Sequence, residues 1–387
     1  MKKVLLLLLA LFVGFSAVGC QDAEDEDITK VGLIVSAAGA NDNGYNEFAI
    51  DGLENAETDF EIDTHVVTTA DDVPGSLETL ASDGYDLIFS LEYNFNALIT
   101  DDGSGQSIAE QYPDTIFVIF NAFANTDPDT GDKIHDNVIE VLFNVNEASF
   151  LAGALSVMVN ENNDVLFTDE DYSFTPTSES RAVGFVGGTQ SDGILVFSYG
   201  YAEGVNYVAS DLGVTYDYYD TYSAGFGATP ANYNTIDSFY DAGANVVFAA
   251  AGGVSTNMKN AAKDNGKLAI DVDANQDASV PGAVLTSVLK NTNVAVYDLV
   301  QKYVNDTIEG GVELFYDLDS GATGITDLSV IEGYIADTTA AQDAWQTIKD
   351  DIETIRGLIS DGTIDVTDAQ SGESIDIDSL SNVDKAN

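Results

Sequence analysis

NVVFAAAGG (residues 245–253) is an apolar run that ends in a pair of glycines. A helix-like stretch near Asn257–Asp264 follows it, and then a second apolar run, LAIDV, at residues 268–272. Strands that are apolar on both faces and are separated by a helix are typical of a parallel sheet covered by helices on both sides. This strand–helix–strand unit therefore predicts an α/β fold.

The same alternation extends along most of the chain. One series of apolar strands and helices begins at Val31–Val35 and reaches Ile116–Phe120. A second series begins with a helical stretch at Ala148–Val159 and ends at Leu268–Val272. Two such series joined by short connections predict two doubly wound parallel-sheet lobes that are linked by a hinge.

The first twenty residues have the order of a secretory signal peptide. Lys2 and Lys3 precede the apolar run Val4–Val13, and small residues then lead to Cys20, the only cysteine. The run is shorter than a helix that spans a bilayer. Small residues before a lone cysteine are similar to a bacterial lipobox, so we expect Cys20 to carry a lipid after cleavage. An ordinary signal peptide followed by a coincidental cysteine is the alternative.

These patterns divide the chain into five segments. Two acidic, turn-rich stretches, Asn125–Asn137 and Asn160–Ser180, are expected to be surface excursions within them. The expected segments are a signal peptide (1–19), the lipidated cysteine with an acidic tether (20–29), lobe 1 (30–145), lobe 2 (146–280) and returning segments that complete both lobes and the hinge (281–387).

The charge is extreme for a chain with a normal apolar content. Asp and Glu number 66 against 13 Lys and Arg, which gives a formal net charge of −53, while 45% of the residues are hydrophobic. That apolar fraction supports a core and argues against intrinsic disorder. A surface of this sign repels the phosphate backbone, so we expect no nucleic-acid partner.

Self-repulsion of this size destabilises a compact state in dilute buffer. At molar salt the Debye length falls to about 3 Å, and most of the repulsion disappears. We therefore predict a halophilic source and a melting temperature that rises from low to molar NaCl. A melting temperature that does not rise would contradict this prediction.

The sequence lacks the residues and motifs that disulfides, metal sites and common catalytic sites require. One Cys and two His, far apart at His65 and His135, predict neither a disulfide nor a thiolate or imidazole metal site. The Asp pairs that begin at Asp127 and Asp317 lack the Gly and Glu of a calcium-binding EF-hand loop. The motifs of serine hydrolases, P-loop nucleotidases and zinc peptidases are absent. We expect no cofactor, no metal and no enzymatic activity; the alternative is a hydrolase that uses two carboxylates.

Polar groups follow several of the predicted strands, where ligands bind in α/β lobes. The loop after the first strand, AGANDNGYNE (38–47), contains Asn41, Asp42, Tyr45 and Asn46. Glycines follow the strands near Val183 and Val246, and glycine permits close approach of a ligand to the backbone. Asp273 and Lys290 follow two further strands, and a carboxylate beside an ammonium offers an acceptor and a donor to hydroxyl groups.

Taken together, these segments resemble the basic membrane protein family, the purine-nucleoside-receptor-like substrate-binding lipoproteins of ABC transporters. The resemblance extends to about residue 310 and implies two lobes with the type I periplasmic-binding-protein fold. It rests on nine blocks: GANDNGYNEFAIDGL (39–53), LASDGYDLIFS (80–90), YPDTIFVIFN (112–121), VLFNVNEASFLAGALS (141–156), VGFVGG (183–188), FSYGYAEGV (197–205), DAGANVVFAAAGG (241–253), AIDVDANQ (269–276) and VLTSVLKNTNVAVYDLV (284–300).

The resemblance implies a nucleoside that is bound between the lobes, with its base stacked between two aromatic rings. Tyr45, where the family usually has Phe, matches one ring and Phe197 matches the other. Asp273 and Lys290 match the residues that bind the ribose, and the backbone of Gly252 matches a contact with the ligand.

Two positions depart from the family pattern, and both are expected to face the edge of the base. Ser36 and Asn121 stand where the family commonly has Asp. A carboxylate only accepts hydrogen bonds, whereas Ser and Asn both donate and accept, so the base preference is left open.

The function that the resemblance implies is nucleoside capture for an ABC importer, with a purine nucleoside as the favoured ligand. The partners would then be a permease and its ATPase, and the protein would be anchored to the membrane by its lipid, facing the periplasm or the cell exterior. Two alternatives use the same clamp: a sensor that signals to a receptor, and a protein that binds another small neutral ligand.

Overall fold

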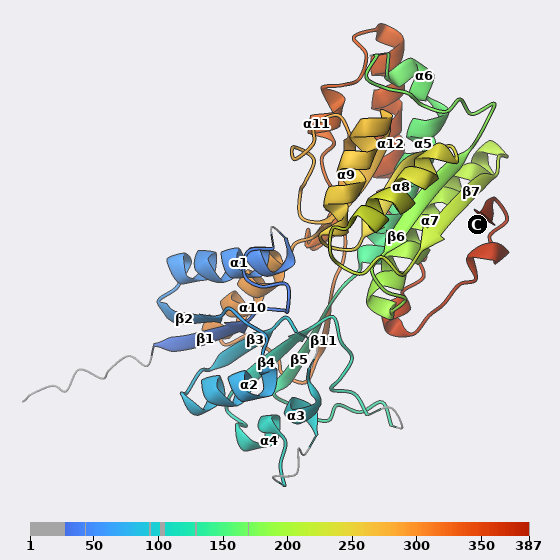
Figure 1. Cartoon of the computed structure of the whole chain (residues 1–387). Helices are drawn as coiled ribbons and strands as arrows, with labels where there is room; N and C mark the ends of the chain where they lie inside the picture. The colour runs from blue at the N-terminus through green and yellow to red at the C-terminus, as the bar shows by residue number, and fades with distance from the viewer. Residues whose placement is uncertain are drawn as a thin grey trace, which may run out of the picture.

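The computed structural model describes residues 28–42, 44–92, 94–100, 105–127, 130–168 and 170–386. The predicted signal peptide, Cys20 and most of the acidic tether lie outside these residues. The described chain forms two α/β lobes that are joined by three narrow connections (Figure 1). Among the described residues, no helix is both long enough and apolar enough to cross a membrane.

Lobe 1 is built on a six-stranded parallel sheet with the order β11-β5-β4-β3-β1-β2. Its helices lie on both faces of this sheet. The strands are β1 (Thr29–Ile34), β2 (Ile62–Val67), β3 (Leu87–Ser90), β4 (Ile116–Phe120), β5 (Val138–Phe143) and β11 (Glu313–Tyr316), and the helices are α1 (Tyr45–Asp59), α2 (Val73–Ser82), α3 (Asn96–Ile99), α4 (Ile108–Gln111) and α10 (Thr292–Val304).

Side chains of strand β1 alternate between the two faces of this sheet. Leu33 belongs to the core cluster that contains Leu53 of α1, whereas Ile34 belongs to the cluster that contains Leu77 and Leu80 of α2. Successive side chains of a strand point to opposite faces, so a strand that is apolar throughout requires a helix on each side. The doubly wound architecture predicted from the sequence is confirmed.

Lobe 2 is built on a seven-stranded sheet with the order β12-β10-β9-β8-β6-β7-β13, in which β12 is antiparallel to β10. This antiparallel edge strand departs from the all-parallel expectation. The strands are β6 (Ala182–Gly187), β7 (Tyr216–Thr221), β8 (Ala244–Ala250), β9 (Leu268–Asp273), β10 (Val284–Lys290), β12 (Thr323–Ile325) and β13 (Val383–Ala386), and the helices are α5 (Val145–Glu161), α6 (Asn163–Leu166), α7 (Asp192–Leu212), α8 (Pro230–Asp241), α9 (Val254–Asn265), α11 (Ser329–Glu332) and α12 (Thr339–Ser360).

The three connections between the lobes leave from the carboxyl ends of strands. The chain passes from β5 into α5, from β10 into α10, and from β11 into β12. Backbone hydrogen bonds join neighbouring connections: Asn144 N donates to Tyr316 O at 2.9 Å, and Asn291 N donates to Ala322 O at 2.7 Å. Both sheets therefore present the carboxyl ends of their parallel strands to the junction between the lobes, where ligands bind in folds of this kind.

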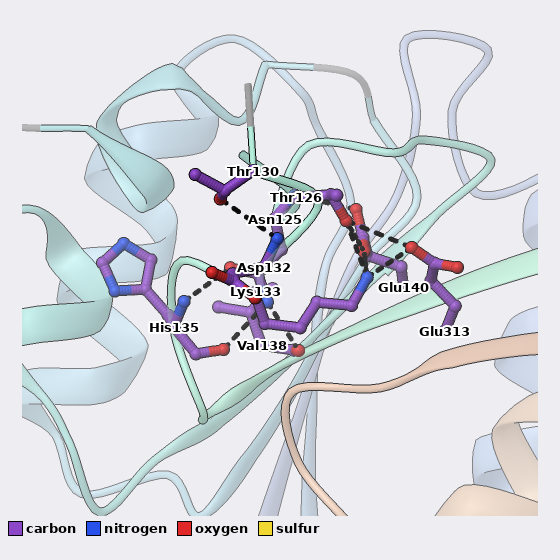
Figure 2. Close-up of polar contacts among 9 residues, drawn as sticks. All are labelled: Asn125, Thr126, Thr130, Asp132, Lys133, His135, Val138, Glu140 and Glu313. Atoms are coloured by element: carbon purple, nitrogen blue, oxygen red, sulfur yellow. Dashed lines mark hydrogen bonds and ion pairs between the residues drawn. The ribbon is translucent and has the colours of Figure 1, made fainter. Parts of the chain in front are cut away.

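The stretch Asn125–Asn137 is not the simple surface excursion that its acidic sequence suggested. Asn125 and His135 are buried, and the Asn125 amide donates to His135 O at 2.8 Å and to Val138 O at 3.1 Å. Figure 2 shows Lys133 of this stretch between the carboxylates of Glu140 on β5 and Glu313 on β11. A buried amide and an ion pair with the sheet tie this loop to lobe 1.

The stretch Asn160–Ser180 also contributes to a core. Asn160 is buried at the end of α5, and its side chain bonds to Tyr216 Oη at 2.8 Å and to Asn245 Nδ2 at 2.6 Å. Phe167 is buried, and its ring packs 4.7 Å from the ring of Tyr172. Polar residues dominate this sequence, but amide hydrogen bonds and an aromatic cluster hold it against lobe 2.

Helices α5 and α7 approach closely because glycines line their contact. A Cβ on Gly204 would overlap the carbonyl oxygen of Phe150, and a Cβ on Gly200 would overlap that of Asn146. We predict that Gly204→Ala lowers the free energy of unfolding by about 3 kcal/mol, because the helices must separate. Gly193 of the same helix has open space around it. The control Gly193→Ala should be neutral or stabilise by up to about 1 kcal/mol; urea unfolding that ranks the two variants equally would contradict this packing.

Candidate functional site

The polar loop after β1 is shaped around the start of helix α1. The carboxylate of Asp42 accepts hydrogen bonds from the backbone N–H groups of Asn46 at 3.0 Å and Glu47 at 3.1 Å. A carboxylate at this position satisfies N–H groups that have no partner within the helix. Asp42 thus determines where α1 begins and places Tyr45, its first residue, at the edge of lobe 1.

Asn46 and Ser36 hold the other end of this loop. Asn46 is completely buried, and its amide donates to Ser36 Oγ and to Gly39 O, both at 2.9 Å. Its Oδ1 accepts a hydrogen bond from Ser36 N at 2.9 Å. These contacts assign Asn46 a structural role, and they use one of the two acceptor positions of the Ser36 hydroxyl. Asn41 is exposed.

Asn121 lies beside Tyr45 at the carboxyl end of β4. Its backbone is in the left-handed region at φ 59°, and its N–H donates to Val141 O at 2.8 Å. Its Nδ2 donates to Tyr45 Oη at 2.7 Å. Tyr45 and Asn121, two of the side chains that lobe 1 was expected to contribute, therefore contact each other.

Asp273 and Lys290 end the neighbouring strands β9 and β10 of lobe 2. Lys290 is buried, with its Nζ 5.5 Å from the ring centroid of Tyr45 and 5.4 Å from that of Phe143. Asp273 has a left-handed backbone at φ 68°, and a Cβ on Gly44 would lie 3.6 Å from its own Cβ. Residues from both lobes are thus gathered around Tyr45.

Burial disfavours the charged forms of both Asp273 and Lys290. Burial raises the pKa of Asp273 to about 6, although the nearby Lys290 opposes this shift and Asp42 reinforces it. Burial lowers the pKa of Lys290 to about 8, and Asp273 opposes that shift. At pH 7 both groups are mainly ionised in a poorly solvated place, where hydrogen bonds to a polar ligand gain strength.

The structure does not bring Phe197 to this group. Phe197 is 4% exposed and packs edge-on against Phe248, at a centroid distance of 6.2 Å, inside the core of lobe 2. Its place in a helix that covers the sheet buries its ring. The position therefore corrects the expectation that this ring is open to a ligand.

Phe226 is an exposed aromatic residue of lobe 2 that the sequence did not single out. It is 53% exposed, in the loop between β7 and α8, although most large apolar side chains of the lobe are buried. Gly253 N donates to Phe226 O at 3.0 Å, and any side chain on Gly188 would collide with the Phe226 ring. Gly252, at φ 51°, lies beside the same residue. The glycines after β6 and β8 thus make room for an exposed ring, and the flanking glycines in GFG (225–227) are the signal that could have identified it.

Two surface hollows lie away from the lobe junction. One is between β2 and α2 beside His65 and Tyr85, and the other is between α1 and α10 beside Asn55 and Tyr297. Neither is lined by a residue that the sequence singled out for ligand binding. Within the described ranges, no group of three His, Cys, Asp or Glu side chains is placed to hold a metal ion.

A family model described as ABC transporter substrate-binding protein, PnrA-like, matches residues 28–356. The chain belongs to this family. Its members are substrate-binding proteins, which bind a small-molecule ligand and deliver it to a membrane permease. The resemblance that was identified from the nine sequence blocks is confirmed.

Curated relatives match this substrate-binding protein along most of its length. Basic membrane protein A of Borreliella burgdorferi is 25% identical over 328 residues, which cover 84% of this chain and 87% of that protein. An uncharacterized lipoprotein of Pyrococcus abyssi is 27% identical over 339 residues, which cover 85% and 76% of the two chains.

Solved structures have the same fold. A solute-binding protein of an ABC transporter system from Aeropyrum pernix superposes with a TM-score of 0.68 at 21% identity and covers 88% of this chain and 93% of its own. A second such protein, from Conexibacter woesei, has a TM-score of 0.63 at 16% identity and covers 88% and 99%.

Proposed function

We propose that this substrate-binding protein captures a nucleoside between its lobes and presents it to an ABC permease. One observation carries the proposal: a buried ammonium and a carboxylate end adjacent strands of lobe 2, and both lie against the Tyr45 side of lobe 1. Sugar hydroxyls bind best where the protein offers both a hydrogen-bond donor and an acceptor, and a neutral aromatic base binds best against the face of an aromatic ring. A nucleoside combines these two requirements in one molecule.

In this proposal each residue has a separate task. Tyr45 stacks on one face of the base, and Phe226 of lobe 2 takes the task that the sequence resemblance implied for Phe197. Asp273 accepts hydrogen bonds from the ribose hydroxyls, and Lys290 donates to the same sugar. The backbone of Gly252 lies against the ligand. Each lobe alone offers half of the site, so binding favours closure, with the three connections absorbing the change in backbone angles.

We also propose that the protein is held at the membrane by a lipid on Cys20 and faces the periplasm or the cell exterior. The order of basic, apolar and small residues before the only cysteine supports this anchor. A Cys20→Ser variant expressed in a bacterial host should move from the membrane fraction to the soluble fraction. A variant that remains in the membrane fraction would contradict lipidation at Cys20.

Mass spectrometry of the ligand released from freshly purified, denatured protein tests the nucleoside assignment, with calorimetric titration of purine and pyrimidine nucleosides as the second measurement. Phe226→Ala should weaken nucleoside binding, because a stacked ring contributes about 0.5–1.5 kcal/mol beyond its buried area. Phe197→Leu should lower stability and leave affinity nearly unchanged. A titration in which no nucleoside binds, or one that releases free base, would overturn the proposal.

Nucleoside affinity should be greatest between about pH 6 and pH 8. Below about pH 6 the carboxyl of Asp273 is protonated and loses acceptor capacity, and above about pH 8 Lys290 loses its charge. Calorimetry from pH 4.5 to 9.5 should therefore show affinity falling on both sides. Asp273→Asn should abolish the loss of affinity at low pH and move the loss at high pH to lower pH, because Asp273 no longer supports the charge of Lys290. A loss at low pH that persists in this variant would assign it to another group.

A further inference from the structure

A chain of hydrogen bonds determines how the Asn121 amide is turned. Tyr45 Oη lies 2.7 Å from Asn121 Nδ2 and 3.5 Å from the backbone carbonyl oxygen of Leu91. Tyr45 Oη donates to this carbonyl, and an amide nitrogen can only donate, so the phenol oxygen is the acceptor of the bond from Asn121. The amide nitrogen of Asn121 is therefore committed to Tyr45.

The other end of this amide has no partner. Asn121 Oδ1 is buried and accepts no hydrogen bond from any residue that the structure describes. The backbone around it is fixed, since Asn121 N bonds to Val141 O and Asn125 N bonds to Glu140 Oε1 at 2.7 Å. A buried acceptor without a donor is costly, and a ligand that supplies an N–H gains the difference.

We propose that this acceptor selects bases that carry a ring N–H. The inference rests on the proposed function, since it assumes a nucleoside in this site. 6-Oxopurines and uracil present such a donor, whereas adenine and cytosine present an acceptor nitrogen at the corresponding ring position. An acceptor that faces Oδ1 leaves two lone pairs opposed, so adenosine and cytidine bind more weakly. Because Oδ1 is covered in this structure, the base reaches it through a local side-chain shift over Asn121.

Tyr45 acts in this inference as a positioning residue for the amide as well as a stacking ring. Without its hydroxyl the Asn121 amide is free to turn and to offer Nδ2 to an acceptor base. Tyr45→Phe keeps the ring and removes only this orientation. An Asp at position 121 would accept from the phenol and still present an acceptor to the base, so Asn121→Asp should keep the selectivity.

Calorimetric titration with inosine and adenosine tests the inference. Wild-type protein should bind inosine about 10- to 100-fold more tightly than adenosine. Tyr45→Phe should reduce this ratio to about 3-fold or less, mainly through tighter binding of adenosine, and Asn121→Asp should preserve the ratio. Equal affinities in the wild type, or an unchanged ratio in Tyr45→Phe, would overturn the inference and leave the nucleoside assignment standing. Binding of neither nucleoside would overturn both.

Lys290 is a further hydrogen-bond donor near Tyr45, with its Nζ 5.5 Å from the centre of the Tyr45 ring. Lys290→Met separates its influence from that of Asn121. The variant should bind both nucleosides more weakly and keep their ratio. A ratio that collapses in Lys290→Met would assign the selectivity to the ammonium and overturn the role of Oδ1.

Discussion

Asp273→Asn is expected to weaken nucleoside binding roughly 10- to 100-fold, because hydrogen bonds to a charged group contribute about 1.5–3 kcal/mol. Asparagine has nearly the same shape and tolerates the left-handed backbone at φ 68°. The same change should leave the protein as stable as the wild type or more stable at pH 7. Burial already raises the pKa of Asp273 to about 6, so the folded state gains when this charge is removed.

Loss of affinity together with equal or higher stability distinguishes a binding residue from a structural one. Asp306 is the matched control, since it has a left-handed backbone at φ 55° and is exposed after α10, far along the chain from the site. Asp306→Asn should change neither quantity. Calorimetry and thermal unfolding of both variants measure the effect, and an Asp273→Asn protein that binds as the wild type does would remove Asp273 from the site.

Lys133→Met is expected to lower the free energy of unfolding of lobe 1 by about 3 kcal/mol, because it leaves a buried carboxylate without its partner. Glu140 is 0% exposed, and Lys133 Nζ lies 2.7 Å from its Oε2 (Figure 2). Burial alone would lower the pKa of Lys133, but the hydrogen bonds with Glu140 and Glu313 raise it above its ordinary value. The ammonium is therefore held in its charged form by this pair.

A second variant separates the lost ion pair from a general disturbance of the loop. Lys133→Met combined with Glu140→Gln removes both charges and should recover at least half of the lost stability. Lys302→Met is the surface control: Lys302 pairs with Asp298 at 2.7 Å but is 41% exposed, so its removal should cost less than about 1 kcal/mol. If urea unfolding shows equal losses for Lys133→Met and Lys302→Met, the buried pair is not a stabilising element of lobe 1.

The pattern of the sequence was sufficient for the fold because burial on both faces leaves a local signature. The run from Val246 to Ala250 is apolar throughout, and it makes up most of the buried strand β8, which has helices on both sides. The antiparallel strand β12 has no such signature. It has three residues, and its direction follows from where the chain returns after the third connection.

The candidate site could be predicted only in part. Tyr45, Asp273 and Lys290 follow strands, and parallel strands bring their carboxyl ends to one edge, so their approach follows from topology. The sequence does not distinguish Phe197 from Phe226, which are both phenylalanines of lobe 2. Phe197 is 4% exposed because α7 packs on the sheet, whereas Phe226 is 53% exposed because its ring occupies the space above Gly188.

Local order and composition by themselves determined the two-lobed α/β class, the acidic surface and the set of strand ends that carry polar groups. Those properties depend on the spacing of apolar residues and on charge, which a linear chain displays directly. The tertiary structure alone decided which side chains are open to a ligand. It also decided that the Asn46 amide bonds within its own loop and that a hydrogen bond to Tyr45 orients the Asn121 amide. Such outcomes depend on contacts between residues up to 76 positions apart, and no pattern of neighbours along the sequence encodes them.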